Sequence, residues 1–166
     1  MTVNAHNRKV LVGIVMGSQS DWATMVKTTE VLDELEIGWE AIICSAHRTP
    51  ERAHEFGSGA ADKGVKVIIA AAGMSAHLAG VMASLTHLPV LGVPMDGKLM
   101  GGLDALLSTC NMPKGIPVGT MSMGSHGAVN AALFAAAIIG TGDVAVCENL
   151  IAYRARQTAA IGADPV

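Results

Sequence analysis

The strongest constraint on the fold is an alternation of short apolar runs with longer segments of helical periodicity. Residues 9–16 (KVLVGIVM) form a continuous apolar run rich in β-branched residues, as expected for a strand that is buried on both faces. Residues 21–36 follow, with apolar side chains at nearly helical spacing. The same pattern predicts further strands over 39–44, 66–72, 89–94 and 116–121, and helices over 50–63, 76–86, 102–110, 126–140 and 143–158.

Five alternations of strand and helix, with no composition break, linker or repeat, are typical of one class of fold. They predict an α/β protein with a doubly wound parallel sheet of about five strands in three layers, of Rossmann or flavodoxin type. We expect a single domain over 1–166, with a flexible N-terminal tail at 1–8 and a C-terminal tail at 159–166. In such sheets ligands bind beyond the carboxyl ends of the strands.

Composition and charge narrow the possible partners. The chain is 51% hydrophobic and only 15% charged, which leaves few charges to coat a monomer and favours a homo-oligomer. The net charge is −3 and there is no basic stripe, so nucleic acid is not an expected partner.

The cysteines and the apolar runs bear on the compartment. The run after Arg8-Lys9 is read as a first strand rather than a signal peptide, and the apolar stretch 128–139 is too short to span a membrane. We therefore expect a cytoplasmic protein without a membrane partner. Its three cysteines lie far apart, form no zinc pattern and are expected to be reduced: Cys44, Cys110 and Cys147.

The loop after the first predicted strand reads GSQSDW from Gly17. Gly17 permits a tight turn, and Ser18 and Ser20 place hydroxyls ahead of a helix N-terminus, which is a natural phosphate site. Asp21 would repel a phosphate set beside it but can accept hydrogen bonds from ribose hydroxyls. The alternative is plain capping, with Ser20 as the N-cap. Gly17 is no part of a GxGxxG, so a dinucleotide fold is unsupported.

The loop after the second predicted strand reads SAHR over 45–48 and leads into Thr49-Pro50, a typical helix start. Arg48 can grip an anion with two parallel hydrogen bonds. His47 carries an imidazole, the side chain best suited to moving protons at neutral pH. The sequence therefore places a proton carrier beside an anion-binding group. The alternative is that His47 is an exposed loop histidine with no functional role.

The loop after the third predicted strand is small and exposes its backbone, which suits close approach of a flat ligand. It comprises Gly73, Met74, Ser75 and Ala76, followed by His77 at a helix start. His77 is read either as a capping or packing residue or as a ligand contact. The histidines show no metal-ligand spacing.

These stretches together resemble the class I aminoimidazole ribonucleotide carboxylase family, the PurE-type N5-carboxyaminoimidazole ribonucleotide mutases of purine biosynthesis. The motifs that carry the resemblance are MGSQSDW, SAHRTP, AAAGMSAHLAG, LPVLGVP, MPKGIPVGT and GAVNAALFAA, in that order over about residues 9–158. The resemblance implies a flavodoxin-like fold, assembly as a homo-octamer, and no metal or organic cofactor.

The resemblance also implies an isomerase that moves a carboxyl group from the exocyclic amine of the ribonucleotide to ring carbon C4. It does so by decarboxylation and recarboxylation, with His47 as the single proton shuttle. By matching position, Ser18 and Arg48 hold the phosphate, Asp21 the ribose, and Ser45 and the backbone of the third loop line the imidazole and CO₂ pocket. The full predicted site is catalytic His47 with substrate-binding Gly17, Ser18, Ser20, Asp21, Ser45, Ala46, Arg48, Gly73, Met74, Ser75 and Ala76.

The third loop departs from the common family form, which is nearer GAGGAAHLPG. Ala71, Met74, Ser75 and Ala79 are substitutions; Met74 can narrow the CO₂ pocket and Ser75 can add a hydrogen bond. Three alternatives therefore stay open. They are a class II carboxylase that uses free CO₂ directly, another carboxylase or decarboxylase of a nucleotide-like acid, and a non-catalytic nucleotide-binding module that does not need His47.

Overall fold

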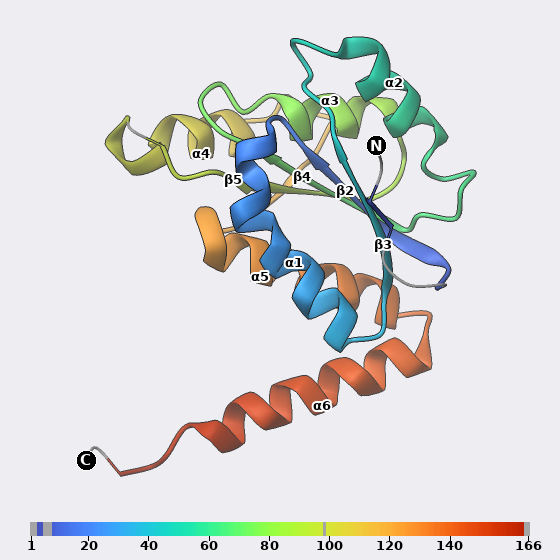
Figure 1. Cartoon of the computed structure of the whole chain (residues 1–166), viewed down its shortest axis with the longest axis vertical. Helices are drawn as coiled ribbons and strands as arrows, with labels where there is room; N and C mark the ends of the chain where they lie inside the picture. The colour runs from blue at the N-terminus through green and yellow to red at the C-terminus, as the bar shows by residue number, and fades with distance from the viewer. Residues whose placement is uncertain (1–2, 5–7, 98, 165–166) are drawn as a thin grey trace.

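A computed structural model describes residues 3–4, 8–97 and 99–164 (Figure 1). Its sheet has the strand order β1-β3-β2-β4-β5-β6. The last five strands pair in parallel, which gives the flavodoxin-like order and confirms the predicted α/β class. These strands are β2 (Val10–Met16), β3 (Gly38–Ile43), β4 (Val67–Ala72), β5 (Val90–Pro94) and β6 (Gly119–Thr120).

Helices cover both faces of this sheet (Figure 1). On one face, α1, α5 and α6 enclose a core with β2, β3 and β4; on the other, α2 and α3 pack over the opposite sides of the same strands. The helices are α1 (Trp22–Glu34), α2 (Pro50–Gly59), α3 (Leu78–Leu85), α4 (Leu103–Cys110), α5 (Gly124–Gly140) and α6 (Val144–Ala160), with short 3-10 turns η1 (Gln19–Asp21) and η2 (Met100–Gly102).

Helix α5 approaches the sheet and α1 closely because its inner face is made of alanines. Ala128, Ala131, Ala132, Ala135 and Ala136 are fully buried. At this contact the Thr28 hydroxyl of α1 donates a 2.9 Å hydrogen bond to the backbone oxygen of Ala128. The small side chains therefore fix α5 against the frame that carries the loops.

Two predicted elements are shorter than expected. The strand predicted over 116–121 pairs only at Gly119–Thr120, because β6 is an edge strand and Pro117 has no N–H to donate. The helix predicted over 50–63 ends at Gly59, and a turn that closes at Gly64, with φ of +91°, leads into β4.

The ends of the chain also bear on the expected tails. Val3–Asn4 form β1, which pairs antiparallel with Ala41 and Glu40 of β3, whereas residues 1–2 and 5–7 of the expected N-terminal tail lie outside the described residues. At the other end α6 continues to Ala160, and residues 165–166 lie outside the described residues.

The order of the strands determines where a ligand site can form. β2 lies between β3 and β4, so the strand order reverses direction at β2. At such a switch point the loops that leave neighbouring strands diverge, and a crevice forms at the strand ends. Met16, at the end of β2, pairs with Ile43 on one side and with Ala71 on the other. The three candidate loops therefore leave the sheet side by side.

In the described part of the chain, no helix combines the length and apolar character needed to cross a bilayer.

Candidate functional site

The loop after β3 is a tight turn built by Ser45 and Thr49. The Thr49 hydroxyl accepts a hydrogen bond from the Ser45 N–H at 2.9 Å and lies 3.1 Å from the Ser45 carbonyl oxygen, to which it can donate. Pro50 then begins α2, as predicted, with Thr49 at the N-cap position. Because the turn is bonded across its base, His47 and Arg48, two of the three residues between, project from the end of the sheet.

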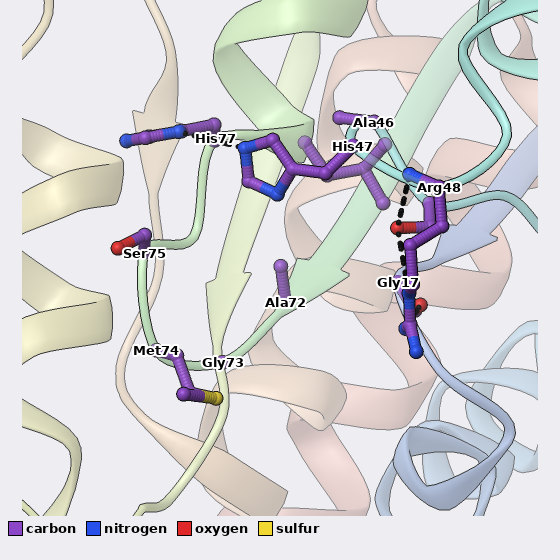
Figure 2. Close-up of a pocket in the computed structure, with 11 residues that line it drawn as sticks. Gly17, Ala46, His47, Arg48, Ala72, Gly73, Met74, Ser75 and His77 are labelled. Carbon is purple, nitrogen blue, oxygen red and sulfur yellow. Dashed lines mark hydrogen bonds between the residues drawn. The ribbon is translucent and has the colours of Figure 1, made fainter.

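His47 meets a second imidazole. Its Nε2 lies 3.0 Å from Nδ1 of His77, and the two rings are 5.1 Å apart between centroids at an interplanar angle of 79°. One of these nitrogens must carry the hydrogen that the other accepts, so the pair shares a proton between two exposed rings (Figure 2).

The position of His77 was expected at the start of α3, but its contact with His47 was not. His77 occupies the N-cap position of α3 and its side chain makes no capping hydrogen bond, so the capping interpretation is wrong. Only the topology could have indicated the contact between His47 and His77, because the loops after β3 and β4 flank the end of β2, where the strand order reverses.

Arg48 links the loop after β3 to the loop after β2. Its Nη2 donates a 2.8 Å hydrogen bond to the carbonyl oxygen of Gly17, and its Nε donates to the Ser45 hydroxyl at 3.3 Å. These bonds hold the guanidinium in one orientation at the mouth of the site (Figure 2). A fork of N–H groups fixed in this way is suited to a phosphate or carboxylate.

The first loop satisfies much of its own hydrogen bonding. Ser20 caps neither element: Ser18 is the N-cap of η1, and Asp21 is the N-cap of α1. Ser18 forms a capping box in which Asp21 Oδ2 accepts from the Ser18 N–H at 3.1 Å. The Ser20 hydroxyl lies 2.9 Å from the Ser18 hydroxyl. Burial raises the pKa of Asp21, against the opposing effects of hydrogen bonds from Ser18 and Ser20 and of the nearby Arg48 charge.

Two adjoining cavities meet at Arg48. The first has a volume of about 340 Å³ and contains both histidines; the second, of about 300 Å³, contains Ser18. Gly17, Ser45 and Arg48 line both. Of the remaining predicted site residues, Ala46, His47, Gly73, Met74 and Ser75 line the first cavity, whereas Ser20, Asp21 and Ala76 are not among the described residues that line either one.

The loop after β4 forms the wall opposite Arg48 (Figure 2). Met74 there has a left-handed backbone, with φ of +57°, and its side chain is 77% exposed. Gly73 before it packs near Met95, and Ala76 after it is buried. Within residues 3–4, 8–97 and 99–164, no three His, Cys, Asp or Glu side chains gather closely enough to hold a metal ion.

Comparison with known proteins identifies relatives of the whole chain. Residues 11–160 match the family model described as AIR carboxylase. The chain is 51% identical to an N5-carboxyaminoimidazole ribonucleotide mutase of Brucella melitensis, over 93% of this chain and 95% of that protein. It is 47% identical to the protein of the same name from Vibrio parahaemolyticus, over 93% of this chain and 96% of that one. Among solved structures, PurE of Treponema denticola superposes with a TM-score of 0.82 at 27% identity, covering 90% of this chain and 92% of that chain.

Proposed function

The chain belongs to the AIR carboxylase family, and from this we propose that it converts N5-carboxyaminoimidazole ribonucleotide into its C4-carboxylated isomer in purine biosynthesis. The names and the high identity of its relatives support the reaction. The observation that carries the assignment of residues is the His47–His77 pair in a cavity that continues, past Arg48, into a second one.

The reaction needs one proton to be delivered and one to be removed. When the carbamate N–C bond breaks, CO₂ leaves and the exocyclic nitrogen gains a proton to become the amine. The electron-rich C4 then attacks the same CO₂, a C–C bond forms, and the proton on C4 departs. The two steps balance, because the proton supplied in the first is recovered in the second.

His47 is the proton carrier in this proposal. An imidazole can give and take a proton near neutral pH, and His47 lines the larger cavity. His77 acts as a positioning residue, because a hydrogen bond at 3.0 Å to one ring nitrogen of His47 sets the tautomer and the orientation of that ring. No metal or organic cofactor is needed in this scheme.

The two cavities suit the two ends of a ribonucleotide. The smaller one presents Ser18 and the Arg48 guanidinium to the phosphate, and the larger one presents His47 to the base. Asp21 and Ser20 are assigned to the ribose side of the first loop. Since Asp21 already accepts a hydrogen bond from Ser18, ribose binding would use its remaining lone pairs.

We also propose a cytoplasmic homo-oligomer, an octamer by family resemblance. Apolar side chains on the surface support an interface between subunits: Leu107 is 54% exposed, Phe134 46% and Ile151 62%. Sedimentation of the purified chain would measure the number of subunits, and a monomer at micromolar concentration would contradict this part of the proposal.

Two assays run in parallel test the reaction. One offers the N-carboxylated ribonucleotide generated in situ, and the other offers aminoimidazole ribonucleotide with bicarbonate; formation of the C4-carboxylate is followed in both. We expect rapid conversion of the carbamate only. Efficient use of bicarbonate would instead support direct carboxylation, for which the altered third loop is the motivating observation.

The variant His47→Asn separates an enzyme from a binding module. We expect it to lose turnover while it keeps affinity for aminoimidazole ribonucleotide, because Asn can form hydrogen bonds but cannot carry the proton. A near-normal rate in His47→Asn would refute the proposed role. No product from the wild-type chain in either assay would favour a nucleotide-binding module.

A further inference from the structure

Met74 has a backbone conformation that a side chain disfavours. Its φ of +57° lies in the left-handed region, where glycine fits without strain. Two other described non-glycine residues have a positive φ. Glu36 follows the end of α1, where the next N–H bonds back to Leu32, so a helix cap explains it. Met100 begins the 3-10 turn η2 and lines neither cavity. Met74 ends no helix, and it lies in the loop after β4.

Burial does not explain a methionine at this position either. The Met74 side chain is 77% exposed, so it gains little from packing within the chain. It nevertheless lines the larger cavity, next to Gly73 and across from Arg48 (Figure 2). Strained residues of this kind are concentrated at functional sites, where the strain is offset by what the side chain does there.

The surroundings of Met74 indicate which part of a ligand it would meet. Gly73 and Ser75 flank Met74 in this wall and Ala72 lies next to Gly73, so small side chains surround it, whereas the charge of Arg48 lies at the other end (Figure 2). A bound nucleotide with its phosphate at Arg48 would present its flat base toward Met74. A thioether is flexible and polarizable, and it makes favourable contacts with aromatic rings.

We propose that Met74 is a specificity-determining residue that covers the base of the bound ribonucleotide and retains the released CO₂ beside C4. The inference rests on the proposed function and deepens it. When CO₂ is retained, C4 is carboxylated. When CO₂ escapes, aminoimidazole ribonucleotide is the product, and the proton delivered to its amine is replaced on the enzyme from water.

The quantity that reports this role is the product partition, the moles of C4-carboxylate formed per mole of carbamate consumed by the enzyme. A blank without enzyme corrects for spontaneous loss of CO₂. A purely structural role for Met74 would change the amount of active protein but would leave this ratio unchanged.

Three variants separate the side chain from the strain. Met74→Ala removes the thioether and keeps a β-carbon in the left-handed backbone, Met74→Gly removes both, and Met74→Leu keeps the apolar bulk. We expect Ala and Gly to increase the ratio of free amine to C4-carboxylate by roughly 2- to 12-fold, the range for loss of one thioether–ring contact. Leu keeps the apolar cover but lacks the sulfur, so its ratio should lie between those of wild type and Ala.

Thermal melting of the same proteins provides the control for strain. We expect Met74→Gly to melt above Met74→Ala, because glycine alone fits the left-handed backbone without cost. If Met74→Ala and Met74→Gly shift the product partition equally although their melting temperatures differ, the shift is due to loss of the side chain and not to backbone strain.

Two results would overturn the inference while the proposed function stands: an unchanged partition in all three variants, or a Leu variant that loses as much product as Ala. Absence of C4-carboxylate from the wild-type chain would overturn the proposed function and this inference together.

Discussion

Replacing Arg48 tests whether the guanidinium at the junction of the two cavities anchors the substrate. Its Nη2 and Nε groups bond to the Gly17 carbonyl and the Ser45 hydroxyl, at 2.8 and 3.3 Å. Within the described residues these bonds leave the rest of the five-donor fork for a phosphate. In Arg48→Ala both the positive charge and the oriented donors are lost.

The expected magnitude follows from the kind of bond that is removed. A charge-assisted hydrogen bond contributes about 1.5–3 kcal/mol, which corresponds to a roughly 10- to 150-fold increase in Kd. Arg48→Lys keeps a charge but loses the planar fork, so its affinity should lie between those of Arg48→Ala and wild type. Because the phosphate does not change during the reaction, the loss should raise KM and leave kcat nearly unaltered.

Binding of aminoimidazole ribonucleotide by titration calorimetry, together with kcat and KM for the carbamate, measures these effects. Arg52→Ala is a matched control, since Arg52 is an exposed arginine four residues further along the chain, in α2, that also bonds to a strand-end carbonyl, that of Ile43 at 3.0 Å. It should bind like wild type. An unchanged Kd in Arg48→Ala, or a fall in kcat larger than the rise in KM, would refute the anchoring role.

Two further predictions concern stability. Because burial raises the pKa of Asp21 above 3.8, the folded state binds this proton more tightly, so the contribution of the group to stability is present below pH 3.8 and is lost as pH rises through the folded pKa. Denaturant unfolding should therefore show a downward slope across that window in wild type that is reduced in Asp21→Asn; equal slopes would contradict this. Gly127→Ala would drive a β-carbon into the backbone oxygen of Ser122, and we expect a loss of more than about 3 kcal/mol in unfolding free energy. The control Gly59→Ala has nothing within 4 Å of the new carbon and should be neutral or slightly stabilising, so similar losses in both would refute the steric argument.

The strands of the sheet could be predicted from the sequence because they are buried on both faces. Their apolar runs leave little choice of register, and β2, β4 and β5 begin and end within a residue or so of their predicted bounds. The strand predicted at 116–121 is present but reduced to Gly119–Thr120, because this apolar run lies at the edge of the sheet. Pairing there depends on a single neighbour, which periodicity does not reveal.

The candidate site could be predicted as a set of loops but not as a set of contacts. The rule that ligands bind at the carboxyl ends of parallel strands led to His47, Arg48 and the loop after β4. The bond from Arg48 to the Gly17 carbonyl and the pairing of His47 with His77 depend on side-chain rotamers and on the twist of the sheet. Neither property is encoded in the local pattern of residues.

The histidine pair has a consequence for how activity arises during folding. Its two rings come from the loops after β3 and β4, the strands on either side of β2, and lie 30 positions apart in the chain. Neither loop alone can produce the pair, and a fragment that ends before β4 contains only one of its members. Under the role proposed for this pair, activity therefore requires the third parallel strand and the loop that follows it. Its appearance during folding would report the pairing of β3 and β4 with β2 more directly than helix content does.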